Sequence, residues 1–228
     1  NSFNNLLSKK CASVIAEFFN NYKPQLNFEP TSEQAGLRAF KLNLMNLFCY
    51  CDDGIAVVKN LYKTATNMTD EIGYLTLLVK HNKVEDEIDH FYDKWEANHN
   101  VIDKWFATQA VHTNPKKSLE VVANLTKHFD FEIKNPNRFR SVIGAFAANN
   151  LPGFHQEDGK GYDLVTDWLI ELDAINPQTT ARVCTTFDNW KIFDEGRQIK
   201  MKQNLLRLSG IPNISKNTYE IVDLILSK

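Results

Sequence analysis

Arginines at helix starts are the residues of this sequence whose types and spacing most clearly permit chemistry. Arg138 and Arg140 follow directly after Pro136, in the segment "NPNRFRSVIGAFAANN". A helix start carries the positive end of the helix dipole, where anions rather than cations are stabilised. No Asp or Glu stands three or four residues from either arginine, so the usual local ion pair cannot form. Guanidinium groups in this position are suited to bind a carboxylate or peptide carbonyl oxygens.

Gln178 and Arg182 repeat this pattern on a later helix, after Pro177. They are four residues apart and therefore share one helix face. The polar groups of both segments could converge on one surface and bind a ligand together. The alternative is that each arginine pairs with an acid from a distant helix or is simply solvated. The sequence leaves the two alternatives open for Arg138 and favours the shared surface for Arg140 and Arg182.

Small residues follow these arginines on the same helix faces. Arg140 lies in line with Gly144 and Ala147, and Arg182 is followed on its face only by Thr185 and Thr186. We expect a groove beside the guanidinium groups, because small side chains leave space there.

A second polar cluster, "FHQEDGKGY", spans residues 154–162. His155, Glu157 and Asp158 could act there as general base and acids. Asp-Gly and Lys-Gly are turn dipeptides, however, and acids just before a helix complement its dipole, so we favour a turn. The six histidines form no H-E-x-x-H pair and the four cysteines lack paired ligand spacing, which argues against a zinc site built from local ligands.

Apolar residues recur at helical spacing along nearly the whole chain, with no convincing strand pattern. Aromatic residues such as Trp95, Trp105, Phe106, Trp168 and Trp190 fall within this spacing and are expected in the core. Asn114, Asn135 and Asn176 each precede a proline and should cap helices. The spacing predicts helices over residues 3–20, 33–51, 54–63, 70–81, 84–97, 100–112, 116–129, 136–149, 160–174, 177–191, 194–209 and 216–227. Short turns between them predict a single all-α domain over 1–228, an irregular superhelix of antiparallel helix pairs of the armadillo or HEAT type.

Composition limits the possible partners. The chain has 228 residues, with 26 basic and 28 acidic side chains, and its net charge of -2 favours neither nucleic acid nor an anionic membrane. No apolar run is long enough for a membrane span, and the first residues lack the features of a signal peptide. Unpaired cysteines then indicate buried thiols in a reducing cytoplasm. The first residue is Asn1 rather than Met, from which we expect an excised fragment.

The order of several short motifs resembles the C-terminal helical domain of bacterial aminopeptidase N, the alanyl aminopeptidase branch of the zinc gluzincins. The resemblance covers essentially the whole chain and is strongest from Asn67 onward. The motifs are "NMTD" at 67–70, "DKWF" at 103–106, "NPNRFRSVIGAF" at 135–146, "FHQEDGKGY" at 154–162, "NPQTTARV" at 176–183 and "RQIKM" at 197–201.

This resemblance implies a function that the periodicity does not show. In the family, the catalytic zinc, its H-E-x-x-H ligands and the loop that holds the substrate amine belong to an earlier domain, and none of them is present here. The C-terminal domain caps the catalytic domain of the same polypeptide and encloses the cavity where peptides enter. By motif matching, Arg140, Gln178 and Arg182 are similar to the family residues that face this cavity on the leaving-group side. The "CYC" pair at 49–51 and Glu195-Gly196 depart from the pattern and leave side-chain preference open.

Two other classes of function stay open from the residues alone. A stand-alone helical scaffold would bind partner proteins through its concave face. An independent hydrolase would use His155, Glu157 and Asp158 and would show turnover by this chain alone.

Overall fold

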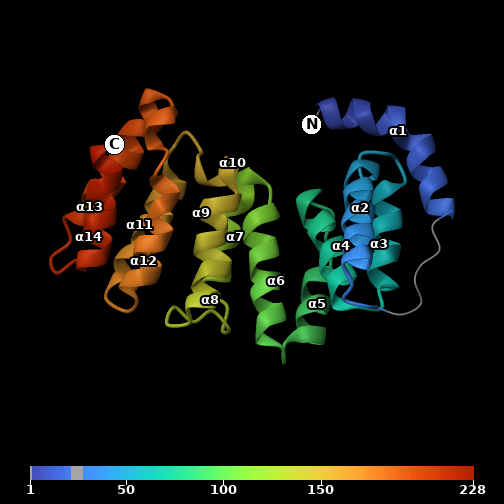
Figure 1. Cartoon of the computed structure of the whole chain (residues 1–228), viewed down its shortest axis with the longest axis horizontal. Helices are drawn as coiled ribbons and strands as arrows, with labels where there is room; N and C mark the ends of the chain where they lie inside the picture. The colour runs from blue at the N-terminus through green and yellow to red at the C-terminus, as the bar shows by residue number, and fades with distance from the viewer. Residues whose placement is uncertain (1, 22–27) are drawn as a thin grey trace. The chain divides into compact units, whose positions relative to one another are not determined.

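The computed structural model describes residues 2–21 and 28–228, and in these ranges it is helical without any strand (Figure 1). This confirms the all-α prediction. The elements are α1 (Ser2–Asn21), α2 (Ser32–Phe48), α3 (Gly54–Lys63), α4 (Met68–Lys80), α5 (Glu87–Trp95), α6 (His99–His112), α7 (Pro115–Leu125), α8 (Pro136–Phe139), η1 (Arg140–Gly144), α9 (Ala145–Asn149), α10 (Leu151–Phe154), α11 (Lys160–Asp173), α12 (Pro177–Cys184), η2 (Thr185–Phe187), η3 (Trp190–Ile192), α13 (Glu195–Ser209) and α14 (Lys216–Ser227).

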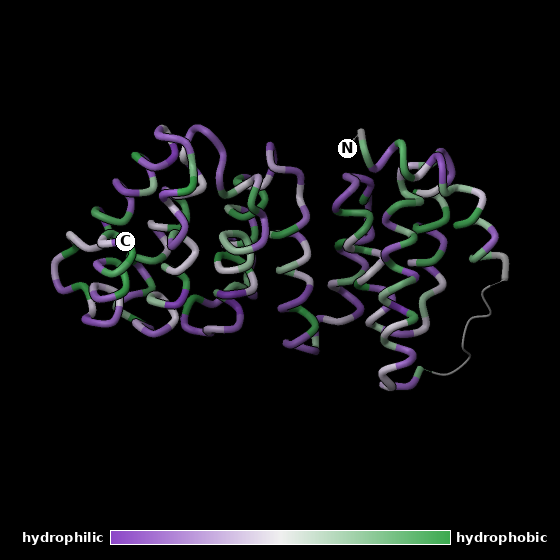
Figure 2. The backbone as a smooth tube through the Cα atoms, turned by 45° about the horizontal axis from the view of Figure 1, so that its top comes forward, coloured by the Kyte–Doolittle hydropathy of each residue, from purple (hydrophilic) through white to green (hydrophobic). Residues whose placement is uncertain are grey.

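The chain packs as two compact units, Asn1–Lys94 and Trp95–Lys228. That the two behave as one domain stays a prediction. In both units, apolar and polar residues alternate along the helical turns, as expected for helices with one buried face (Figure 2). In the first unit, α4 supplies more buried apolar side chains than any other helix and packs against α2 and α3. The residues that could do chemistry belong to the second unit.

The Asn-Pro sequences start helices as predicted. Asn114, Asn135 and Asn176 each accept a hydrogen bond from a backbone N–H two or three residues further on, and the proline occupies the first turn. These caps satisfy N–H groups that a helix start leaves without partners. They fix where α7, α8 and α12 begin.

The three largest differences from the predicted boundaries lie in the second unit. The helix expected over 116–129 ends at Leu125, where Thr126 takes the C-cap position. The helix expected over 177–191 ends at Cys184 and continues as two 3₁₀ turns, η2 and η3. The turn expected over 150–161 contains the short helix α10.

The break after α12 has a local cause. Thr185 and Thr186 donate their hydroxyl protons to the carbonyl oxygens of Arg182 and Val183, each three residues earlier, at 2.8 Å. Side-chain hydrogen bonds of this kind compete with the backbone pattern of an α-helix. The chain therefore tightens into 3₁₀ turns at this point.

The helix that starts at Pro136 contains a π turn, η1, at Arg140–Gly144. A π turn holds one more residue than an α turn, and such turns are frequent at functional sites. Its apolar side is buried, since Val142 and Ile143 have no exposed surface. The turn brings Arg140 and Gly144 one above the other on the outer side of the helix: a Cβ added to Gly144 would lie 3.6 Å from the Cβ of Arg140.

Aromatic rings form the centre of the second unit. Phe154 lies edge-to-face against Phe146, Tyr162 and Phe187, and all four side chains are almost completely buried. Among the residues expected in the core, Trp105, Phe106 and Trp190 are buried, whereas Trp95 and Trp168 are half-buried. The aromatic contacts join the neighbouring elements α9, α10 and α11 to η2, which comes later in the chain.

The last helix, α14, begins at a carboxylate from another helix. Asp173, the last residue of α11, is 5% exposed and accepts hydrogen bonds from the backbone N–H and the hydroxyl of Ser215, both at 2.7 Å. It also accepts a hydrogen bond from the buried Thr218 hydroxyl. Ser215 in turn caps α14 by accepting the N–H of Thr218. Asp173 thus holds the start of α14 against α11.

Candidate functional site

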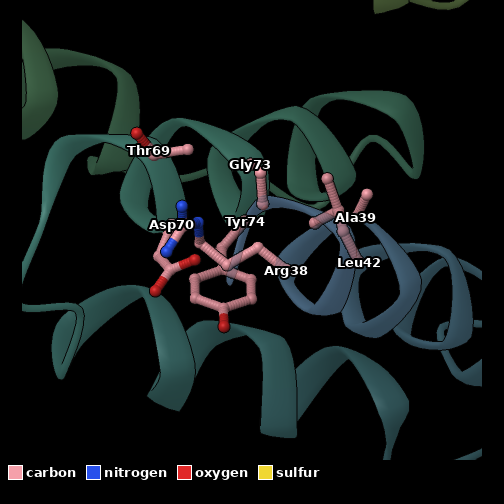
Figure 3. A pocket seen from close by; sticks show the side chains of 8 residues that line it. Arg38, Ala39, Leu42, Thr69, Asp70, Gly73 and Tyr74 are labelled. Carbon is pink, nitrogen blue, oxygen red and sulfur yellow. The ribbon is translucent and has the colours of Figure 1, made fainter. Parts of the chain in front are cut away.

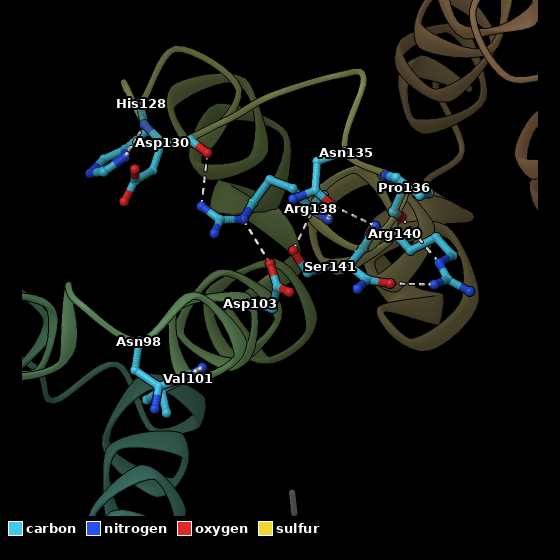
Figure 4. A network of polar contacts seen from close by, with 11 residues as sticks. Asn98, Val101, Asp103, His128, Asp130, Asn135, Pro136, Arg138, Arg140 and Ser141 are labelled. Atoms are coloured by element: carbon cyan, nitrogen blue, oxygen red, sulfur yellow. Dashed lines mark hydrogen bonds and ion pairs between the residues drawn. The ribbon is translucent and has the colours of Figure 1, made fainter.

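Arg138 is a structural residue. Its side chain is 3% exposed, and its Nε donates to Asp103 Oδ1 at 2.7 Å (Figure 4). Its Nη1 donates to the carbonyl oxygen of Asp130 at 2.8 Å, and the guanidinium lies 4.7 Å from the centre of the Phe106 ring. Of the two alternatives for Arg138, the acid from a distant helix is therefore the correct one. The pair joins α8 to α6.

Arg140 lies two residues further on and has a different environment. Its side chain is exposed, with Nε 3.1 Å from the carbonyl oxygen of Pro136 and Nη2 2.5 Å from Oδ1 of Asn137 (Figure 4). Both contacts lie within its own helix start. No carboxylate of the described residues forms an ion pair with Arg140, so its charge stays available to a ligand.

Gln178 and Arg182 are exposed on one face of α12, while Thr179, Thr180 and Ala181 between them are buried. Neither polar side chain forms a hydrogen bond or ion pair with another described residue. The helix is held through its buried face, against α11 and α14. The exposed face of α12 therefore presents an amide and a guanidinium that are free to bind.

The helices that carry Arg140 and Arg182 meet at Gly144. A Cβ added to Gly144 would lie 3.7 Å from Cγ2 of Val183, the residue next to Arg182, and 3.6 Å from Cβ of Arg140. A larger residue at 144 would fill the space between the two helices. The structure thus places the two segments side by side, as the shared-surface hypothesis requires. That their polar groups bind one ligand stays a prediction.

A groove of about 630 Å³ continues from these helices. We call it the α10 groove. Its lining includes Ala147, Ala148 and Leu151 from α9 and α10, and Thr185, Thr186 and Ile192 from η2 and η3. Ala147 and the two threonines are the small residues that follow Arg140 and Arg182 in the sequence pattern. Both sets of lining residues therefore belong to segments that follow the two arginines in the chain.

His155 lines the same groove. Its Nδ1 lies 2.9 Å from the hydroxyl of Tyr162, and its ring stacks on Phe193 with 4.2 Å between centroids. Burial lowers the pKa of His155, and the nearby positive charge of Arg197 lowers it further. His155 is therefore neutral near pH 7.

Neither the Glu157 nor the Asp158 carboxylate is hydrogen-bonded to His155. Both side chains are exposed; Asp158 lies 3.4 Å from Lys160 and Glu157 lies 3.8 Å from Arg197. Asp158 also accepts the backbone N–H of Lys160 at the start of α11, as the turn interpretation requires. Nothing in this arrangement supports an independent hydrolase.

A smaller cavity of about 220 Å³ lies between α2 and α4 in the first unit (Figure 3). Ala35, Ala39 and Gly73 leave the space, and Arg38 and Asp70 lie at its edge. The Arg38 guanidinium donates to Gln34 Oε1 at 3.0 Å and covers the ring of Phe28. The Arg38 guanidinium is thus engaged by neighbouring side chains. We interpret the cavity as space left by the small residues Ala35, Ala39 and Gly73.

Comparisons with known proteins first define the class. Nearly the whole chain, residues 1–227, matches the family model described as "Domain of unknown function (DUF3458_C) ARM repeats". The armadillo-type architecture expected from the helix pairs is thereby confirmed. The chain belongs to this family of helical-repeat domains.

Relatives identify the protein context more closely. The chain is similar to aminopeptidase N of Haemophilus influenzae, 36% identical over 86% of this chain and 23% of that protein. It is 34% identical to aminopeptidase N of Escherichia coli, over 94% of this chain and 25% of that protein. The crystal structure of Legionella pneumophila aminopeptidase A in complex with aspartic acid superimposes with a TM-score of 0.89 and 25% identity, over 99% of this chain and 28% of that one. These matches confirm the resemblance to aminopeptidase N, and the chain spans about a quarter of the length of these relatives.

No three His, Cys, Asp or Glu side chains of the described residues gather in a way that could hold a metal ion. None of the helices in the described ranges combines the length and apolar character needed to cross a membrane.

Proposed function

We propose that this chain is the C-terminal capping domain of a zinc-dependent aminopeptidase that removes N-terminal residues from peptides. In this proposal it packs on the catalytic domain of the same polypeptide and helps to enclose the cavity that peptides enter. The observation that carries the proposal is the match to aminopeptidase N at 34–36% identity over 86–94% of the chain. Because the relatives are about four times longer, the chemistry is assigned to the rest of the polypeptide.

The substrate-binding residues in this proposal are Arg140, Gln178 and Arg182. Their side chains are exposed, and the two helices meet at Gly144. A guanidinium that lines a closed cavity would donate hydrogen bonds to the carbonyl oxygens or terminal carboxylate of a peptide. We assign these residues to the part of the peptide beyond the scissile bond.

The zinc of the full-length enzyme is placed outside this chain. A catalytic zinc requires about three protein ligands, and the described residues do not bring three suitable side chains together. The zinc would activate the attacking water in the catalytic domain. The isolated chain should therefore not hydrolyse an alanyl anilide, and metal analysis should find no stoichiometric zinc.

The proposed environment is the cytoplasm, with no nucleic acid or membrane partner. The cysteines of the described residues are free thiols, which fits a reducing compartment. The net charge of -2 gives no general attraction to polyanions.

The experiment compares two substrates in the full-length enzyme. A tripeptide extends past the scissile bond, whereas an alanyl anilide ends there. Arg140→Ala and Arg182→Ala should each reduce kcat/KM for the tripeptide by roughly tenfold to a hundredfold, because a charge-assisted hydrogen bond is lost. Both variants should change kcat/KM for the anilide much less.

Arg207→Ala is the matched control, since Arg207 is an exposed arginine on α13 paired with Asp167. The Arg207→Ala variant should leave kcat/KM unchanged for both substrates. Equal losses on both substrates together with a lower melting temperature for the Arg140 and Arg182 variants would show that these arginines are structural. A reading frame without a zinc-peptidase domain before Asn1 would instead favour the alternative, a stand-alone helical scaffold for protein partners.

A further inference from the structure

The α10 groove is lined by hydrogen-bonding groups of both kinds, a donor and acceptors. Tyr162 has no exposed surface, and within the described residues its hydroxyl contacts only Nδ1 of His155. Burial raises the pKa of Tyr162 to about 12, so the hydroxyl keeps its proton. A buried hydroxyl donates that proton where an acceptor is present, and Nδ1 of His155 is the acceptor here.

This hydrogen bond decides the tautomer of His155. If Nδ1 accepts, the ring proton is on Nε2. Nε2 has no hydrogen-bond partner among the described residues and is not one of their buried unpaired atoms, so it reaches solvent. Since His155 lines the groove, its wall there presents an N–H donor.

Thr185 and Thr186 line the same groove and supply acceptors. Their hydroxyl protons are used in bonds to the carbonyl oxygens of Arg182 and Val183. Each hydroxyl oxygen keeps a lone pair for a further hydrogen bond. A donor and acceptors that line one groove suit a peptide backbone, in which each peptide unit offers one C=O acceptor and one N–H donor.

Resting on the proposed function, we propose that the α10 groove is a second peptide-binding site. It holds the backbone of residues further downstream than those that meet Arg140 and Arg182, with His155 as the donor to a peptide carbonyl oxygen. Its apolar walls, including the exposed Leu151 and Ile192, would cover peptide side chains without selecting one type.

The position of the groove sets the peptide length that reaches it. Ala147 and Ala148 follow Arg140 by seven and eight residues, which corresponds to roughly 10 Å along a helix. An extended peptide covers this distance with about three residues. A tripeptide held at Arg140 therefore ends before the groove, and a heptapeptide enters it.

The test uses the full-length enzyme and two peptides that share their first three residues, a tripeptide and a heptapeptide. The double variant His155→Phe/Tyr162→Phe keeps both rings and leaves no buried hydroxyl without a partner, but it removes the donor. We expect kcat/KM to fall about 3- to 10-fold for the heptapeptide, mainly through KM, and to stay unchanged for the tripeptide. His155→Gln, which restores an N–H near the position of Nε2, should recover part of the loss.

Thr186→Val is a second variant, which keeps side-chain shape and removes the acceptor. It should produce the same dependence on peptide length. N-methylation of the heptapeptide at its fifth and sixth residues should lower kcat/KM in the wild type and have little further effect in the Thr186→Val variant. Equal losses on both peptides, or no loss on the heptapeptide in either variant, would overturn the proposal. The Arg140→Ala result on the tripeptide is independent of this outcome, so failure of the groove and failure of the proposed function are distinguishable.

Discussion

Arg138 Nε donates to Asp103 Oδ1 across 35 positions of sequence, at a distance of 2.7 Å. The pair fixes the first turn of α8 against α6, with the guanidinium also covering the ring of Phe106. A cation at the positive end of a helix is unfavourable by itself, and here the carboxylate of a neighbouring helix offsets it. Arg140 has no such acid partner in the described ranges, which separates the structural arginine from the one available to ligands.

Removing one partner of the Arg138–Asp103 pair should destabilise the chain strongly. Arg138→Ala leaves Asp103, whose side chain is 19% exposed, without its cation, and we expect a loss of about 3 kcal/mol in the free energy of unfolding. Urea denaturation of the 228-residue chain measures this. Arg207→Ala, which breaks an exposed pair, should cost less than about 1 kcal/mol. Similar values for the two variants would contradict the structural role of Arg138.

Asp173→Ala should release the start of α14. The variant removes the acceptor for Ser215 and leaves the Thr218 hydroxyl, which is completely buried, without its partner. Loss of hydrogen bonds to a buried charge should cost about 3 kcal/mol. Amide hydrogen exchange should become faster in α14 while α7 stays protected. Uniform protection in both helices would show that α14 is held by its apolar face alone.

Acid should weaken the fold through three histidines. Burial lowers the pKa values of His81, His128 and His155 below the ordinary value of 6.5. At a pH between the folded and unfolded pKa values of a histidine, the unfolded chain binds more protons than the folded chain. The free energy of unfolding is therefore highest above about pH 6.5 and decreases as the pH falls. Urea denaturation at pH 7.5 and 5.5 should show lower stability at pH 5.5.

The double variant His155→Phe/Tyr162→Phe supplies the control for this pH dependence. It removes one of the three groups that must take up a proton, so its stability should change less between pH 7.5 and 5.5 than that of the wild type. An equal change in both proteins would mean that His155 does not contribute.

Two glycines should respond differently to alanine. At Gly144 a Cβ would make ordinary contacts at 3.6 and 3.7 Å, so Gly144→Ala should keep the melting temperature or raise it, because alanine favours helix by about 1 kcal/mol. At Gly161 a Cβ would lie 2.4 Å from the carbonyl oxygen of Phe154, which must then move. Gly161→Ala should lower the unfolding free energy by about 1–3 kcal/mol. The reverse order would contradict the packing of α11 on α10.

Local signals made most of the fold predictable. Apolar periodicity located the long helices, and the Asn-Pro caps fixed three helix starts, because both act within a few residues. The break after Cys184 was missed, although adjacent threonines that can bond back to the carbonyl groups were a usable signal. In the same way, Asn150 and Pro152 could have indicated α10, which Asn150 caps.

The candidate site was only partly predictable, because its key relationships are not local. Arg138 and Arg140 are only two positions apart in the sequence. That Asp103 pairs with Arg138 and not with Arg140 depends on how α6 packs against α8, which the sequence does not show. Nor could it show that Val183 packs on Gly144, since that contact depends on how α12 docks. The small residues after Arg140 and Arg182 do line a groove, but neither arginine lines it, so it is not beside the guanidinium groups as predicted. The hydrogen bond that orients His155 depends on the core around Tyr162 and has no local signal.

The π turn at Arg140–Gly144 also affects how this segment can change in evolution. Such a turn corresponds to one inserted residue in an α-helix. In a homologue with one residue fewer between Pro136 and Phe146, the helix residues after the deletion would keep their buried face. The residues before the deletion would be rotated by about 100° around the helix axis. Its aligned arginine would then point away from α12. An alignment gap in these positions therefore distinguishes homologues that keep the Arg140 geometry from those that lose it while keeping the residue.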